Sequence, residues 1–185
     1  LLTPHCAIIT HLGAPSRRGE TEIISDTVKG FYDDVENIES PGTVEAGDIM
    51  MVGSHFYIGL SERTNKEGAQ QMMSILERYG MSGSTVTMID MLHLKTGVSY
   101  LENNNLLVFG EFTDEPQFAQ YNHIVVPEDE SYAANAIWVN GKVIVAKGFP
   151  NTQQLIEDAG YETIAVDVSE YRKIDGGLSC LSLRF

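Results

Sequence analysis

The sequence has little positive charge. Only 12 lysines and arginines stand against 26 aspartates and glutamates, so the formal net charge of the 185 residues is −14. Nucleic acids and anionic membranes bind lysine- and arginine-rich surfaces, so this balance argues against both as partners and makes a small cationic ligand the better expectation. An acidic surface that serves only solubility is the alternative.

Cysteine and membrane-type segments are also scarce. Two cysteines, Cys6 and Cys180, are too few for a disulfide framework, so a reducing cytoplasm is expected. The five histidines show no zinc-type spacing, so no metal cofactor is expected. The chain has no apolar run of about 18 residues and no basic-then-apolar leader, which predicts neither a membrane span nor a signal peptide. The first residue is Leu1, which is compatible with a start inside a longer protein.

Local patterns predict an α/β fold made of repeated units. The order strand, strand, helix, strand occurs three times, at a period of roughly 40 to 50 residues, which is typical of a repeat architecture. Asn140-Gly141 between two apolar runs is the clearest hairpin signal. The length favours one domain over residues 1–185. The predicted hairpins, helices and closing strands cover 48–59, 65–79 and 85–89, then 98–109, 115–121 and 123–126, then 136–145, 152–159 and 163–166.

The opening segment fits the repeat only in part. A buried strand is predicted at 6–10 and a helix at 20–35, with Ile23, Ile24, Val28 and Phe31 on one face. Together with Leu1-Leu2, the strand resembles the end of a hairpin whose first strand is absent. An exposed strand edge there would favour self-association, so a homo-oligomer is one expectation.

Polar residues at matching points of the repeat form a candidate catalytic set. Glu45 with Asp48, and also His93, precede predicted strands, and Cys180 follows the turn Asp175-Gly176-Gly177 at the start of a short predicted strand. Equivalent positions should converge, and a histidine oriented by a carboxylate can activate a thiol. The alternatives are a buried apolar cysteine, a polar histidine at a strand edge, a turn glutamate and an aspartate that caps backbone.

Three arginines are candidates for binding an anionic group of a ligand. Arg63 lies between a strand and a helix start, where a bidentate contact to a carboxylate is favourable. Arg17 and Arg18 follow the first strand in a similar way. A solvent-exposed loop arginine is the alternative for each of them.

Several motifs together resemble the dimethylarginine dimethylaminohydrolase family of the guanidine-modifying superfamily. They span the chain in the family's order: Gly13-Ala14-Pro15-Ser16-Arg17-Arg18, Gly47-Asp48, Ile58 to Asn65, Leu92-His93-Leu94-Lys95 and Asp175-Gly176-Gly177 with Cys180. The resemblance implies an α/β propeller (pentein) of five ββαβ modules, of which this chain would hold about four. It also implies hydrolysis of N-omega-methylated arginine to citrulline and a methylamine without a metal or organic cofactor.

The resemblance also implies roles for individual residues. Cys180 matches the nucleophile that forms a covalent thiouronium intermediate, His93 the proton donor and later base, and Glu45 the acid that orients the histidine. Arg63 matches the arginine that binds the substrate α-carboxylate, and Arg17 a further substrate contact, with Arg18 in its place if the register shifts by one. The turn Asp175, Gly176 and Gly177 matches the backbone beside the substrate.

Two departures from the family pattern leave alternatives open. His11-Leu12 replaces the usual Arg-Pro, and residues 1–185 lack the family's first module, with its lid, and the acidic stretch that holds the guanidinium. An arginine deiminase-type hydrolase is one alternative. A catalytically impaired, truncated scaffold that oligomerises or binds arginine-like ligands is the other.

Overall fold

The computed structural model describes residues 1–182 of the chain. Contacts along the chain divide these residues into two compact units, Leu1–His93 and Leu94–Ser182. Each unit has its own small sheets and its own apolar core. The single domain over residues 1–185 stays a prediction.

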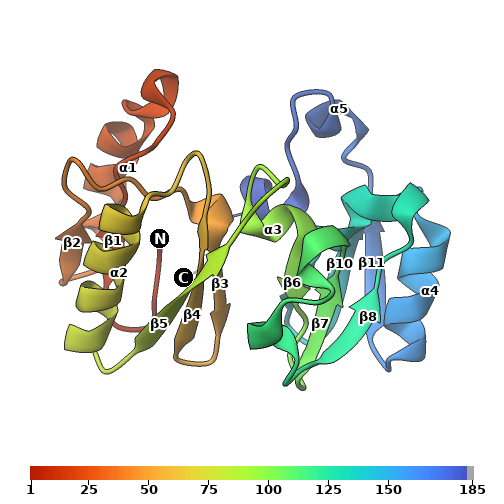
Figure 1. Cartoon of the computed structure of the whole chain (residues 1–185). Helices are drawn as coiled ribbons and strands as arrows, with labels where there is room; N and C mark the ends of the chain where they lie inside the picture. The colour runs from red at the N-terminus through yellow and green to blue at the C-terminus, as the bar shows by residue number, and fades with distance from the viewer. Residues whose placement is uncertain (183–185) are drawn as a thin grey trace. The chain divides into compact units, whose positions relative to one another are not determined.

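The first unit contains a two-stranded and a three-stranded sheet (Figure 1). In the first sheet β1 and β2 are parallel, and in the second β4 is antiparallel to β3 and parallel to β5. The elements in chain order are β1 (Ala7–Ile9), the 3-10 turn η1 (Pro15–Arg17), α1 (Glu20–Val28), β2 (Val35–Asn37), the 3-10 turn η2 (Ala46–Asp48), β3 (Ile49–Val52), β4 (His55–Leu60), α2 (Lys66–Arg78) and β5 (Ser82–Thr87).

Helix α2 is longer than α1, and it was predicted at nearly its observed length. Asn65 caps it, because its Oδ1 accepts from the backbone N of Gly68 at 2.8 Å and from that of Thr43 at 2.9 Å. Its apolar residues recur at helical spacing, and Met72 and Leu76 are completely buried in the core of the unit. This core fixes α2 against the β3–β4–β5 sheet.

The second unit contains two three-stranded sheets, and each repeats the pattern of β3–β4–β5. The predicted Asn140-Gly141 turn joins β9 to β10, with φ of 50° and 79° at its two residues. The elements are α3 (Leu94–Gly97), β6 (Val98–Tyr100), β7 (Asn105–Val108), η3 (Gly110–Phe112), η4 (Pro116–Phe118), β8 (Asn122–Val125), η5 (Glu128–Ala134), β9 (Ile137–Val139), β10 (Lys142–Ala146), α4 (Pro150–Asp158), β11 (Glu162–Val166), α5 (Ser169–Arg172) and η6 (Leu178–Leu181).

The three equivalent sheets confirm the α/β fold class and the repeat read from the sequence. In each of them the first two strands form a hairpin and the last strand is parallel to the second. Between the second and third strands lies α2, the pair η3 and η4, or α4. In the opening segment β1 lies within the predicted strand 6–10, and Leu2 forms an antiparallel bridge with Ala7. The missing first strand stays a prediction.

The predicted helix 20–35 is too long. Helix α1 ends at Val28, and Val35 begins β2, which pairs in parallel with β1. Strand pairing therefore prevails over the helical spacing of the apolar residues. Their shared face is not buried either, since Ile23 is 83% exposed and Phe31 64% exposed.

Two other predicted elements differ in extent. Strand β5 spans Ser82–Thr87 rather than the predicted 85–89, because its pairing with β4 begins at His55 and Ser82. The predicted helix 115–121 is only the 3-10 turn η4.

The cysteine does not begin a strand as predicted. It lies in the 3-10 helix η6, where the backbone N of Cys180 donates to the carbonyl O of Gly177 at 3.0 Å. The neighbouring N–H of Ser179 donates to a side chain, Asn135 Oδ1, instead of to a strand. The last part of the predicted strand, residues 183–185, lies outside the described residues. Within residues 1–182, no helix has the length and apolarity needed to cross a bilayer.

Glu130 caps helix α4 from a neighbouring turn, and its removal should cost stability in a pH-dependent way. Burial raises the pKa of its carboxyl, but hydrogen bonds from the backbone N–H groups of Thr152 and Asn151 outweigh this and leave the pKa below its usual 4.5. A lowered folded-state pKa stabilises the fold above the unfolded-state pKa, and this stabilisation disappears as pH falls through the folded value.

We expect Glu130→Gln to lower the free energy of unfolding by about 1–3 kcal/mol at pH 7, because the amide leaves one buried N–H without an acceptor. Urea unfolding at pH 7 and below pH 4 measures the effect. The difference between wild type and variant should shrink at the lower pH. An equal cost at both pH values would contradict the proposed capping by an ionised carboxylate.

Candidate active site

Glu45 is the centre of a buried hydrogen-bond cluster in the first unit. It lies immediately before η2 in extended backbone and is only 3% exposed. Its Oε1 accepts from the backbone N of Ala14 at 3.1 Å, and its Oε2 accepts from Arg17 Nη1 at 3.2 Å and contacts His93 Nε2 at 3.0 Å. The positive guanidinium and the three donors compensate the cost of burying this carboxylate.

The carboxylate fixes the protonation pattern of the histidine ring. An ionised carboxylate can only accept hydrogen bonds, so the hydrogen lies on His93 Nε2. In the neutral ring the lone pair is then on Nδ1. The ring also packs tightly on Gly47, where an added Cβ would lie 2.7 Å from His93 Cγ. The predicted pairing of Glu45 with His93 is therefore present in the structure, with the ring held in one orientation.

Asp48 has a structural role in the same cluster. It is completely buried, and its Oδ2 accepts from Ser61 Oγ at 2.7 Å and from Thr64 Oγ1 at 2.6 Å. Thr64 Oγ1 also accepts from the backbone N of Glu45 at 3.0 Å. These bonds tie the 61–64 loop to the segment that carries Glu45.

The same loop places Arg63. A Cβ on Gly13 would lie 2.2 Å from the carbonyl O of Arg63, so only glycine allows the two backbones to come this close. The Arg63 side chain is half-buried, and within residues 1–182 no carboxylate forms an ion pair with it. Its guanidinium is thus compatible with the predicted carboxylate-binding role.

Of the two adjacent arginines, Arg17 is the one that reaches the cluster. Its Nε and Nη2 donate to Glu20 and its Nη1 donates to Glu45, whereas Arg18 Nε donates to the carbonyl O of Leu12 at 3.3 Å. The contact with Glu45 favours Arg17 over Arg18 as the arginine that matches the family's further substrate contact.

Cys180 lies in the second unit, at the exposed end of η6. The turn before it contains Asp175 with φ of 58°, a left-handed conformation that aspartate tolerates better than most residues. Gly176 O accepts from Tyr132 Oη at 2.6 Å, and Gly177 is buried against the Asn135 side chain. The approach of Cys180 to His93 stays a prediction.

Some residues that build these sites were missed in the sequence. Tyr132 of η5 and Asn135, which lies just before β9, form hydrogen bonds with the segment Gly176 to Ser179 that precedes Cys180. Asn135 could have been found, because it precedes a first hairpin strand as Glu45 and His93 do. The Ala14 amide and the hydroxyls of Ser61 and Thr64 carry no such signal.

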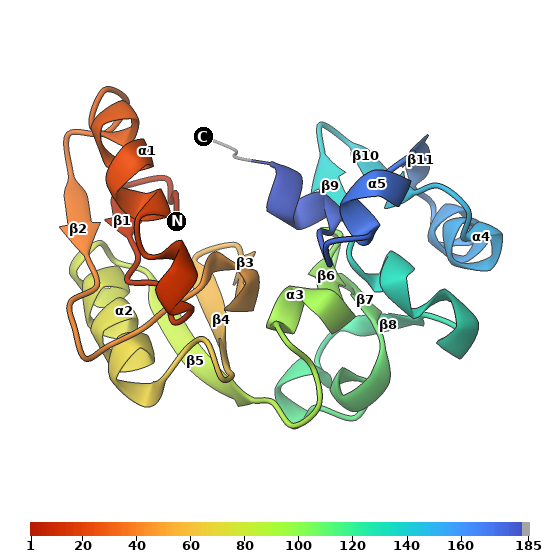
Figure 2. The same cartoon turned by 90° about the horizontal axis from the view of Figure 1, so that it is seen from above.

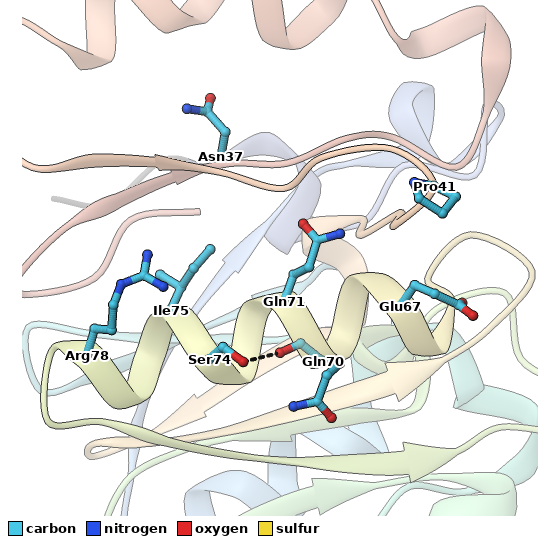
Figure 3. A pocket seen from close by; sticks show the side chains of 8 residues that line it. All are labelled: Asn37, Pro41, Glu67, Gln70, Gln71, Ser74, Ile75 and Arg78. Carbon is cyan, nitrogen blue, oxygen red and sulfur yellow. Dashed lines mark hydrogen bonds between the residues drawn. The ribbon is translucent and has the colours of Figure 1, made fainter.

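A separate pocket lies along α2 and contains none of the predicted site residues (Figure 3). It has a volume of about 530 Å³ and is lined mainly by polar side chains of α2 together with residues of β2 and the loop after it. The lining residues are Asn37, Pro41, Glu67, Gln70, Gln71, Ser74, Ile75 and Arg78. Of these, Arg78 is paired with Glu36 at 2.7 Å.

Comparisons with known proteins agree with the motifs and the fold. The family model for arginine deiminase matches residues 7–132. An N(G),N(G)-dimethylarginine dimethylaminohydrolase of Pseudomonas aeruginosa is 64% identical, and the match covers 100% of this chain and 73% of that protein. Its namesake in Streptomyces coelicolor is 33% identical, with 96% of this chain and 68% of the relative covered.

Solved structures show the same relationship. A cysteine-to-serine mutant of the Pseudomonas aeruginosa enzyme, in complex with citrulline, has a TM-score of 0.98 and 63% identity, covering 100% of this chain and 73% of that one. The N-terminal domain of the cyanobacterial arginine dihydrolase ArgZ has a TM-score of 0.89 at 19% identity, covering 100% of this chain and 72% of that one. At this identity the likeness shows the fold alone. The chain therefore belongs to the arginine deiminase family and, within it, to the dimethylarginine dimethylaminohydrolases.

Proposed function

We propose that this chain hydrolyses N-omega-methylated arginine to citrulline and a methylamine through a covalent intermediate on Cys180. The observation that carries the proposal is the citrulline complex of the 63% identical relative, obtained with its cysteine replaced by serine. A histidine-to-glycine variant forms an adduct with S-methyl-L-thiocitrulline in a second structure of the same identity. The two replaced residues are as far apart in sequence as His93 and Cys180.

The first half of the reaction transfers the amidino carbon to sulfur. The Cys180 thiolate attacks the guanidinium carbon and forms a C–S bond. The C–N bond to the methylated nitrogen then breaks, and protonated His93 gives its proton to the departing methylamine. Glu45 stabilises the charged ring before this transfer and keeps it oriented afterwards. The product of this half is a thiouronium on Cys180.

The second half releases citrulline. Neutral His93 takes a proton from water, the resulting oxygen nucleophile attacks the thiouronium carbon, and the C–S bond breaks to return the Cys180 thiolate. The remaining hydrogen of the attacking hydroxyl leaves to solvent as the carbonyl of citrulline forms, where the released methylamine takes it up. Atoms and charge then balance without a metal or organic cofactor.

The remaining predicted residues serve in substrate binding. Arg63 is proposed to pair with the substrate α-carboxylate, because its guanidinium has no carboxylate partner within residues 1–182. Arg17 is proposed to border the substrate while it holds Glu45. The backbone of Asp175, Gly176 and Gly177 is proposed to line the site.

The cellular setting is also a proposal. A cytoplasmic location is supported by the state of Cys6 and Cys180, which are both free thiols. A methylated arginine is a small cation, which suits a chain of net charge −14. The absence of nucleic acid and membrane partners, and a homo-oligomer, remain predictions.

Citrulline release tests the proposal. The 185-residue chain is incubated with asymmetric dimethylarginine or with arginine, beside Cys180→Ala, and circular dichroism checks that both proteins are folded. Release from dimethylarginine that is lost in the variant supports the function. Release from arginine alone would favour a deiminase, and a folded chain without turnover on either substrate would favour the impaired scaffold.

The tight packing of Gly47 against His93 gives a prediction about orientation. Gly47→Ala should lower kcat by about 10- to 100-fold, since a displacement of the catalytic ring by about 1 Å can cost that much. Gly19→Ala is the matched control, because a Cβ at Gly19 meets nothing within 4 Å. Steady-state kinetics and thermal melting measure both variants. Equal kcat values would show that the ring orientation does not limit turnover.

A further inference from the structure

One side-chain amide fastens the turn that carries Cys180. Asn135 lies between η5 and β9 and is 8% exposed. Its Nδ2 donates to the carbonyl O of Lys95 at 2.8 Å and to Ser179 Oγ at 2.9 Å, while its Oδ1 accepts from the backbone N of Ser179 at 2.9 Å. A single buried group thus joins the start of α3, the approach to β9 and the residue next to the cysteine.

The bonding pattern is specific for an amide. Two donated bonds and one accepted bond require both ends of the carboxamide. An aspartate in its place would turn an acceptor toward the Lys95 carbonyl. An alanine would leave the Lys95 carbonyl and the Ser179 N–H without their partner.

Neighbouring contacts hold the same turn from its other side. Tyr132 Oη donates to the carbonyl O of Gly176 at 2.6 Å. A Cβ on Gly177 would lie 2.8 Å from Asn135 Cγ, so glycine at this position allows the turn to pack closely against the Asn135 amide. Leu178 is 6% exposed and packs in a cluster with Val168. In Figure 2 this blue segment lies at the β9 side of the second unit.

Cys180 follows directly after these anchored residues. Gly176 to Ser179 are fixed by side chains of the unit, whereas Cys180 is exposed. The Ser179 backbone, which Asn135 holds, therefore sets the position of the Cys180 Cα and the direction of its Cα–Cβ bond, from which Sγ extends. Thiol attack needs alignment with the guanidinium carbon, and a displacement of about 1 Å can cost about 100-fold in rate.

We infer that Asn135 is the positioning residue of the nucleophile: it orients Cys180 through Ser179 and does not itself take part in the chemistry. The inference rests on the proposed role of Cys180. It requires that loss of the amide lowers the rate of the chemical step and leaves substrate affinity unchanged.

The test compares Asn135→Ala and Ser179→Ala with the exposed control Asn122→Ala. Asn135→Ala should lower kcat by about 100-fold with KM within about twofold. Ser179→Ala, which removes one of the three bonds, should lower kcat by about 10-fold, and the control should match wild type. Iodoacetamide labelling, mapped by mass spectrometry, should show that Cys180 stays accessible in each variant.

The outcomes separate the inference from the proposed function. Turnover that persists in Cys180→Ala overturns the role of the thiol. Loss of turnover in Cys180→Ala together with an unchanged kcat in Asn135→Ala overturns only the positioning role, as does a rise in KM at constant kcat. If Asn135→Ala does not fold, Ser179→Ala decides, and an unchanged kcat in that variant overturns the inference.

Discussion

Replacement of His93 by alanine is expected to lower citrulline release by a factor of 10² to 10⁴ or more, with the fold retained. The ring is proposed to protonate the leaving amine and then to activate water, so both halves of the reaction depend on it. Its side chain is 20% exposed, and its one described hydrogen bond is to Glu45. Glu45 keeps its bonds from Ala14 N and Arg17 without the ring, so the fold should be retained with some loss of stability.

The measurement for this variant is steady-state citrulline release beside circular dichroism and thermal melting. His55→Ala is a suitable control, because His55 is in the same unit and both ring nitrogens are hydrogen-bonded, to Ser82 and Ser84, but it has no proposed role. The control should keep its turnover. An unfolded His93→Ala protein would instead identify His93 as a structural residue at a strand edge.

Glu45→Gln should have the second-largest effect, a loss of kcat of about 100-fold or more. The glutamine amide cannot accept from Ala14 N, Arg17 and His93 at once, because one end of it is a donor. The ring then loses the partner that fixes its Nε2 hydrogen, and the positive charge of Arg17 loses its buried counter-ion. Stability should fall as well, since the buried amide leaves at least one of the three donors without an acceptor.

Glu20→Gln is the matched control for Glu45→Gln. Glu20 also pairs with Arg17, at 2.9 Å, but its side chain is 55% exposed. An exposed ion pair contributes little, so kcat and the melting temperature should stay close to wild type. Equal losses of kcat in the two variants would mean that Arg17, and not the orientation of His93, determines the effect.

The repeated order of strands and helices could be predicted because its signals are local. The Asn140-Gly141 turn, the Asn65 cap and the helical spacing of Met72 and Leu76 each act within a few residues. The end of α1 could not be predicted in this way. It is set by the pairing of Val35 with Ala7, a contact between distant residues that prevails over helical spacing.

The candidate site was predictable to the extent that it follows the repeat. Glu45 and His93 precede equivalent strands, and the structure brings them into contact. The Ala14 amide that binds Glu45 is backbone, so residue type could not indicate it. The C-terminal segment was predicted as a strand because its apolar residues alternate, but the Asn135 side chain takes the Ser179 N–H that a strand would use.

Covalent labelling of Cys180 during turnover is the most direct test of the proposed chemistry. The chain is mixed with dimethylarginine, quenched in acid within the first turnovers and digested for peptide mass spectrometry. The mechanism predicts a thiouronium adduct on the Cys180 peptide, no adduct on the Cys6 peptide, and no citrulline from Cys180→Ser. Citrulline release by Cys180→Ser at the wild-type rate would contradict the mechanism.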